Sequence, residues 1–255
     1  FELGSGKNFN RAFHELSTPV AELIGTQLGA DAQVNVALIR QAMGQVLDQL
    51  PAPTSQLEAL HRLLLRHACD AEITLDLHCD FEAAIHLYAL PQHWPQWRSL
   101  SAHLNVKVGL LAEDSGGSSF DEACSLPWLR LSRAFPDAQI PLACLATTLE
   151  LGGQADTGRD EAIFHAEGIL AFLAEQGLIK GQWPAPQYEP CEGVPFEGTE
   201  LLFAPHAGVI SYLRKAGDWI EKGEPIFEVI DPLEDHVSTM CAGTSGVLFA
   251  VERLR

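Results

Sequence analysis

Ile73-Thr74-Leu75-Asp76-Leu77-His78 is a short apolar run that predicts a buried β-strand ending in a histidine. A second apolar run, residues 140–151, predicts another strand, which carries Glu150 and leads into Gly152-Gly153. Open α/β sheets build their sites at the carboxyl ends of strands. We therefore expect the His78 imidazole and the Glu150 carboxylate to converge over one crevice.

Helix-like and strand-like segments alternate around these two runs. Apolar residues at three- and four-residue spacing predict helices, and short apolar segments between them predict strands. Helices are expected at 31–50, 55–67, 92–104, 120–134 and 159–176, and further strands at 83–90 and 106–111. This order predicts an α/β fold with a mixed central sheet and helices on both faces.

The composition changes after Trp183, where a proline-containing linker leads to glycine turns and short alternating strands. Residues 203–226 and 242–248 look like the two halves of a biotinyl/lipoyl-type barrel-sandwich. A cofactor carrier of that type needs an exposed lysine at a hairpin tip, but the corresponding turn reads Ser238-Thr239-Met240-Cys241. We expect a domain at 1–183 and a small all-β barrel-sandwich-like domain at 184–255 that is not a carrier.

Charge and cysteine usage restrict the class of protein. The 255 residues have a net charge of −18, and their 16 Lys and Arg are spread along the chain, which disfavours nucleic acid as a partner. No apolar run approaches the ~18 residues of a membrane span. The six cysteines form no Cys-x-x-Cys pair and lie mostly in apolar contexts, as expected for reduced thiols. We expect a cytoplasmic protein with no membrane partner.

A third element, Asn8-Phe9-Asn10-Arg11-Ala12-Phe13, precedes both strands. In the order Asn-Arg, Asp-Leu-His, Thr-x-Glu-x-Gly-Gly, the sequence resembles the succinylglutamate desuccinylase/aspartoacylase family of zinc-dependent amidohydrolases, relatives of the zinc carboxypeptidases. The resemblance runs from about Asn8 to the C-terminus. It implies a carboxypeptidase-like fold, one Zn²⁺ per chain, a small N-acyl amino acid or similar amide as substrate, and a C-terminal module that shapes the site mouth or a homo-oligomer.

The resemblance implies that His78 is a zinc ligand. In hydrolytic zinc sites, three protein ligands leave one position for water. The family takes its other two ligands, a His and a Glu three residues apart, from a motif before the Asn-Arg pair. The sequence contains no His-x-x-Glu, and Phe1 is not a start methionine. We expect that motif in an N-terminal segment absent from the sequence shown. The alternative is a His78 that only bonds nearby backbone.

Glu150 follows an almost wholly apolar run, so we expect a raised proton affinity that suits a general base. It would take the proton from the zinc-bound water and pass it to the leaving amine. Asp76 shares a strand face with His78, because side chains alternate with period two. It is a candidate to orient a ligand imidazole, although a buried Asp that caps a loop is an open alternative.

Arg11 can bind a substrate carboxylate through two parallel hydrogen bonds, and Asn10 offers an amide beside it. By resemblance, this pair holds the substrate, and the arginine helps to polarise the scissile carbonyl. The alternative is a surface ion pair between Arg11 and Glu15.

Several family members carry two more arginines, at positions filled here by Leu3 and Ile140. Arg130 and Arg133 are the nearest substitutes, so the substrate remains open.

The other histidines, among them His86, His93 and His206, fit structural or surface roles, since no partner stands at metal spacing. Two hypotheses follow for the whole chain. One is a zinc-dependent deacylase, and the other is a catalytically silent relative that binds an anionic small ligand.

Overall fold

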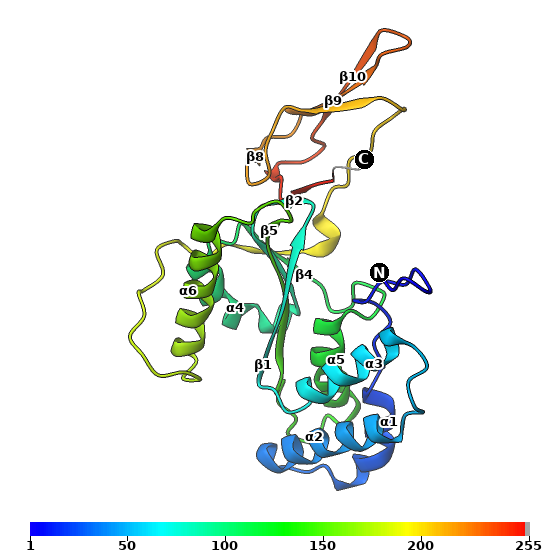
Figure 1. Ribbon diagram of the computed structural model, residues 1–255. Coiled ribbons are helices and arrows are strands. Elements are labelled where there is room, and N and C mark those ends of the chain that lie inside the picture. The colour runs from blue at the N-terminus through cyan, green and yellow to red at the C-terminus, as the bar shows by residue number, and fades with distance from the viewer. Residues whose placement is uncertain (253–255) are drawn as a thin grey trace. The chain divides into compact units, whose positions relative to one another are not determined.

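The computed structural model describes residues 1–252, which fold into two compact units (Figure 1). The first unit contains residues 1–76, 89–93 and 112–148. The second contains residues 77–88, 94–111 and 149–252. Three β-strands, at residues 73–80, 86–89 and 145–153, therefore contribute residues to both units. The predicted boundary between residues 183 and 184 stays a prediction.

The helices and strands have the following bounds. The helices are α1 Ser17–Ile24, α2 Ala32–Gln49, α3 Gln56–Ala68, α4 Trp94–Leu104, α5 Phe120–Ala134 and α6 Arg159–Glu175, with 3-10 turns at Gly25–Gln27, Pro91–His93 and Phe196–Gly198. The strands are β1 Ile73–Asp80, β2 Glu82–Ala83, β3 His86–Ala89, β4 Val108–Leu111, β5 Leu145–Gly153, β6 Gly193–Pro195, β7 Val209–Tyr212, β8 Trp219–Ile220, β9 Pro225–Asp231, β10 His236–Cys241, β11 Gly246–Val247 and β12 Ala250–Val251.

The central sheet has five strands in the order β1-β5-β3-β4-β6. Helices flank this mixed sheet, and separate antiparallel sheets follow toward the C-terminus, so the predicted fold class is confirmed. The outermost strand, β6, pairs in parallel with β4, with Gly109 opposite Gly193. This strand comes after the predicted linker and yet belongs to the central sheet.

Strands β1 and β5 are neighbours that run in the same direction. Leu145 N–H donates to the Glu72 carbonyl at 2.8 Å, and Gln154 N–H donates to the Asp80 carbonyl at 2.7 Å. Both strands end later than the sequence predicts, β1 at Asp80 and β5 at Gly153, and β5 begins at Leu145 rather than at residue 140. His78 therefore lies within its strand rather than at its end, and Glu150 lies within β5.

Local capping explains where the helices begin. Asp31 accepts hydrogen bonds from the backbone N–H groups of Gln33 and Val34, which satisfies donors that the first turn of α2 leaves free. The Ser55 hydroxyl accepts from Glu58 N–H at the start of α3 in the same way. Helix α5 has the bounds that the sequence predicts, 120–134.

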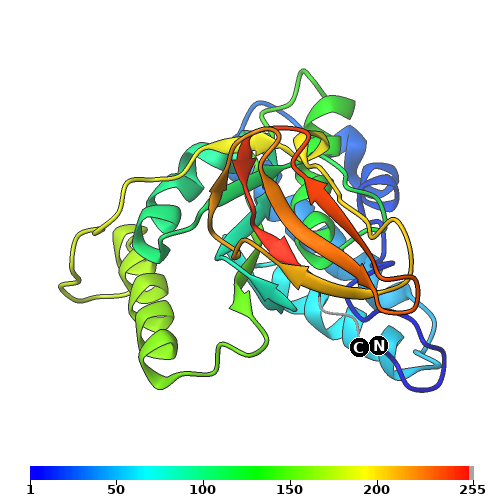
Figure 2. The same ribbon diagram turned by 90° about the horizontal axis from the view of Figure 1, so that it is seen from above.

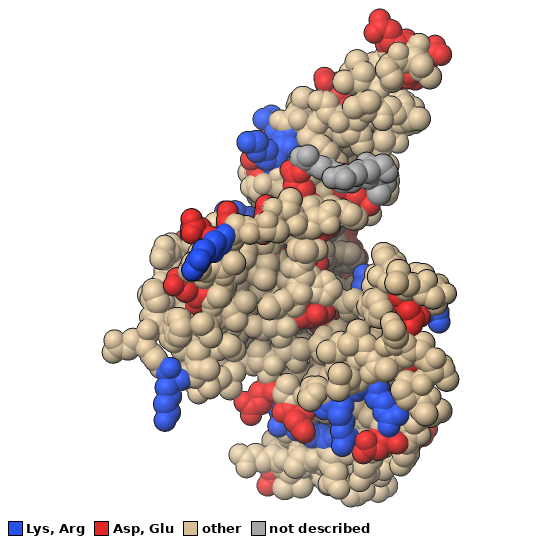
Figure 3. Space-filling model, in the orientation of Figure 1, with Lys and Arg blue, Asp and Glu red and all other residues tan. Residues whose placement is uncertain are grey.

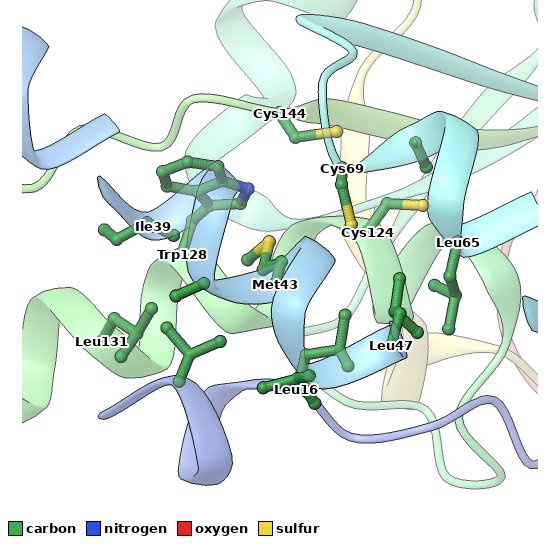
Figure 4. Close-up of a cluster of buried hydrophobic side chains, with 14 of the residues drawn as sticks. Leu16, Ile39, Met43, Leu47, Leu65, Cys69, Cys124, Trp128, Leu131 and Cys144 are labelled. Atoms are coloured by element: carbon green, nitrogen blue, oxygen red, sulfur yellow. The ribbon is translucent and has the colours of Figure 1, made fainter. Parts of the chain in front are cut away.

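The first unit has its core between α1, α2, α3 and α5 (Figure 4). Leu47 and Val20 are fully buried, and Trp128 is 1% exposed. Three buried thiols, Cys69, Cys124 and Cys144, complete one side of this cluster. Burial raises the pKa of Cys69 to about 11, so this thiol stays protonated and behaves as an apolar side chain.

The side chain of Trp94 explains why positions 109 and 193 of the second unit are glycines. A Cβ on Gly109 would lie 2.2 Å from Trp94 Cζ3, and one on Gly193 would lie 2.7 Å from Trp94 Cε2. Because these glycines face each other across β4 and β6, the ring occupies the space that their side chains would fill. On the same unit, α4 packs along α6.

The C-terminal residues form a small antiparallel sheet, β10-β9-β7, and the pair β11-β8 (Figure 2). Their core contains Val229, which is fully buried, together with Ile220 and Phe227. Strand β12 pairs with β2, and Ala84 N–H donates to the Phe249 carbonyl at 2.9 Å. This segment is therefore hydrogen-bonded to residues of the same unit that lie far earlier in the chain.

None of the helices in residues 1–252 has the length and apolar character needed to cross a membrane. On the face that Figure 3 displays, Lys and Arg lie among Asp and Glu rather than in one basic patch.

His93 predicts how the stability of the protein depends on pH. This imidazole is 1% exposed, and neither ring nitrogen has a hydrogen-bond partner. Burial lowers the pKa of His93 from 6.5 to about 4. Between pH 6.5 and about pH 4, the histidine binds a proton in the unfolded chain but not in the folded one. The free energy of unfolding therefore falls as the pH drops through this range. The His93 contribution to this fall is up to about 3 kcal/mol.

We expect His93→Leu to lose less stability than the wild type between pH 7 and pH 4, because the apolar replacement cannot be protonated. Urea unfolding at a series of pH values measures the difference. The exposed His14 serves as the control, and His14→Gln should follow the wild-type curve. Parallel curves for His93→Leu and wild type would contradict the assignment.

Candidate functional site

Asn10 is held by two side-chain hydrogen bonds to distant parts of the first unit. Its Nδ2 donates to Asp76 Oδ2 on β1 at 3.1 Å, and its Oδ1 accepts from Phe120 N–H at the start of α5 at 2.8 Å. Asn8 Oδ1 accepts from the Asn10 backbone N–H, which fixes the local turn. The structure thus joins two of the predicted site residues, Asn10 and Asp76, and orients the amide through both of its polar atoms.

Arg11 is exposed, and its Nη1 donates to the Asn10 carbonyl at 2.6 Å. Its aliphatic part lies against a glycine, because a Cβ on Gly117 would lie 2.9 Å from Arg11 Cδ. Two backbone hydrogen bonds hold the same loop: the Gly117 carbonyl accepts from Ala12 N–H, and the Ser118 carbonyl accepts from Phe13 N–H. This contact between Arg11 and Gly117 is not predicted from the sequence. The signal for it was Gly116-Gly117, whose positive φ angles of 82° and 96° let the loop turn here.

His78 and Glu150 form a second pair, in the second unit. His78 Nδ1 lies 3.9 Å from Glu150 Oε1, and the two side chains are 31% and 14% exposed. This separation is too long for a hydrogen bond between these two atoms. Because β1 and β5 are parallel neighbours, side chains at matching positions point to the same face of the sheet. The imidazole and the carboxylate that the sequence singles out are therefore neighbours.

Arg130 and Arg133, the nearest substitutes for the two further arginines of the family, each form ion pairs with carboxylates of this chain. Arg130 Nη2 lies 3.0 Å from Asp114 Oδ2, and its Nη1 lies 3.5 Å from Glu15 Oε1. Arg133 donates to both oxygens of Glu113, at 2.9 and 2.6 Å. The hydrogen bonds from this guanidinium lower the pKa of Glu113 to about 2 and raise the pKa of Arg133. Glu15, the alternative partner proposed for Arg11, contacts Arg130.

The donor set can be compared with the needs of a zinc ion. An imidazole nitrogen is a suitable ligand, and a carboxylate beside it can serve as a ligand or a base. Within residues 1–252, however, no group of three His, Cys, Asp or Glu side chains is close enough to hold a metal. His78 fits one ligand position, and the described residues do not complete the set.

The fold and these pairs define an α/β protein with an imidazole and a carboxylate on neighbouring parallel strands. No family model and no curated protein sequence matches the chain. Its structural neighbours include proteins named as members of the succinylglutamate desuccinylase/aspartoacylase family, so the resemblance predicted from the sequence is confirmed.

A family protein from Shewanella amazonensis is 25% identical, with a TM-score of 0.80 over 97% of this chain and 69% of the other. A second, from Shewanella frigidimarina, is 21% identical, with a TM-score of 0.78 over 99% of this chain and 72% of the other. A succinylglutamate desuccinylase from Silicibacter is 19% identical, with a TM-score of 0.57 over 81% of this chain and 60% of the other. At these identities, the structures from Shewanella frigidimarina and Silicibacter show that they share the fold of this chain.

The Asn10–Asp76 contact can be tested with a nearly isosteric change. Asn10→Asp keeps the acceptor for Phe120 N–H but replaces the donor to Asp76 with a second carboxylate. We expect a loss of about 1–3 kcal/mol in the free energy of unfolding, since a hydrogen bond to a charged group is lost and like charges meet. Denaturant unfolding at neutral pH measures this loss.

Asn8→Asp is the matched control, because a carboxylate there can still accept from Asn10 N–H. It should change stability by less than about 0.5 kcal/mol. A defect that is equal in both variants would refute the pairing.

Proposed function

We propose that this chain is part of a metal-dependent amidohydrolase that removes the acyl group from a small N-acylated amino acid or a related amide. The observation that carries the proposal is the 3.9 Å approach of the His78 imidazole and the Glu150 carboxylate on neighbouring strands. The structural neighbours named as desuccinylase and aspartoacylase family proteins support the same class of reaction.

In this proposal His78 is one ligand of a Zn²⁺ ion, and two further ligands come from outside residues 1–252. Zinc supplies Lewis-acid activation of water near neutral pH. Glu150 is the general base: its carboxylate takes a proton from the attacking water and returns it to the nitrogen of the leaving amine. Its low exposure beside the imidazole suits proton transfer, because bulk water then competes less for the carboxylate.

Substrate recognition is assigned to the Asn10-Arg11 pair. The Arg11 guanidinium is exposed and can form two parallel hydrogen bonds with a substrate carboxylate. Asn10 is fixed by Asp76 and Phe120, so the backbone carbonyl that contacts Arg11 also has a fixed place. Asp76 is thereby a positioning residue for Asn10, and its predicted role toward a ligand imidazole stays a prediction, as do a homo-oligomer and a cytoplasmic location.

The proposal is tested on protein expressed from the complete gene, by metal analysis and by hydrolysis of a panel of N-acyl amino acids. We expect about one zinc per chain. Glu150→Gln should retain the metal and lose about 10²- to 10⁴-fold in kcat, the usual contribution of a positioned base. His78→Ala should lose both metal and activity. Glu167→Gln, an exposed carboxylate on α6, is the control and should keep both.

A second candidate function is a catalytically silent relative that binds an anionic small ligand through Arg11. The observation in its favour is that residues 1–252 hold no group of three metal-binding side chains. The same measurements separate the two. Protein without zinc that binds N-acyl amino acids in calorimetry, and loses this binding in Arg11→Lys, would overturn the hydrolase and support the silent relative.

A further inference from the structure

Two histidines that are far apart in the sequence converge on one serine in the C-terminal sheet. His206 Nε2 lies 2.9 Å from Ser238 Oγ, and His236 Nε2 lies 3.0 Å from the same oxygen. The two rings are 5.7 Å apart between centroids. His206 precedes β7, whereas His236 and Ser238 belong to β10, so the group joins the two edge strands across β9.

A second contact of His206 shows which of its ring nitrogens carries the hydrogen. Its Nδ1 lies 2.9 Å from the Ala207 carbonyl oxygen, which can only accept, so Nδ1 carries the hydrogen. In the neutral ring this leaves a lone pair on Nε2, directed at Ser238. An imidazole that donates one nitrogen to a backbone carbonyl and presents the other is the arrangement typical of histidine metal ligands.

The surroundings favour a cation. Asp231 stands opposite His236 in the β9–β10 pairing, and its Oδ1 accepts hydrogen bonds from the backbone N–H groups of Leu233 and Glu234. The hairpin turn adds Glu234 and Asp235, and acidic side chains gather at this end of the molecule in Figure 3. Both histidines are at least partly exposed, so an ion can reach them from solvent.

We infer that His206 and His236 form a binding site for a late first-row divalent transition metal, with the Ser238 hydroxyl as a weak third ligand. Imidazole nitrogens suit Cu²⁺, Ni²⁺ and Zn²⁺, with Cu²⁺ bound most tightly. The ion would replace the two hydrogen bonds to Ser238 and link the edge strands β7 and β10. This site is separate from His78, which lies on β1, and stands independently of the proposed hydrolase.

Calorimetric titration with Ni²⁺ tests the site, because Ni²⁺ avoids the thiol oxidation that Cu²⁺ would cause. The full chain carries His78→Ala, so that the candidate catalytic ligand is removed. We expect one equivalent of Ni²⁺ to bind. His206→Gln and His236→Gln should each weaken binding by at least about tenfold, since even the loss of an outer partner of a ligand costs about 10- to 100-fold. The half-buried His165 on α6 is the control, and His165→Gln should bind normally.

Normal binding after either His206→Gln or His236→Gln, or the absence of binding in His78→Ala, overturns the inference. A second measurement needs no substitution. In the NMR spectrum of the wild type, paramagnetic Ni²⁺ should broaden the amide signals around His206 and His236 at substoichiometric metal. Broadening that spares these two segments also overturns it.

Discussion

The parallel pairing of β1 with β5 is the constraint on which the candidate site depends. Hydrogen bonds from Leu145 N–H to the Glu72 carbonyl and from Gln154 N–H to the Asp80 carbonyl set the pairing at the two ends, and the register shifts by one residue between them. Register decides which side chains share a face, and a slip by one residue would turn every side chain of one strand to the opposite face. With the register that is present, His78 and Glu150 become neighbours although no local motif links them.

The end of β5 shows why two glycines follow this strand. Gly152 has a φ of 101°, and a Cβ there would lie 2.8 Å from Asp156 Oδ2. A Cβ on Gly153 would lie 3.0 Å from Glu82 Cα. Gly153 N–H donates to Asp156, so the chain turns sharply beside β2. The Gly-Gly pair is therefore a packing requirement of the strand that carries Glu150.

Electrostatics restricts the recognition of an anionic ligand in a chain with a net charge of −18. Arg130 and Arg133 already face Asp114 and Glu113, so their charge is compensated locally. Arg11 differs from both, because its Nη1 donates to a neutral backbone carbonyl, that of Asn10, and its aliphatic part lies against Gly117. A neutral carbonyl competes less for a guanidinium than a carboxylate does, and this leaves the charge of Arg11 less compensated than that of Arg130 or Arg133.

The sequence by itself determined the elements whose causes are local. Periodicity predicted the bounds of α5 at 120–134, and apolar runs located β1, β5 and the fold class. It also selected His78 and Glu150, since both follow apolar runs. Only the tertiary structure decided which groups meet: Asn10 with Asp76, His206 with His236 around Ser238, and Arg130 with acidic partners. Contacts between distant residues depend on register, loop closure and packing of the whole chain, and short-range sequence patterns carry none of these.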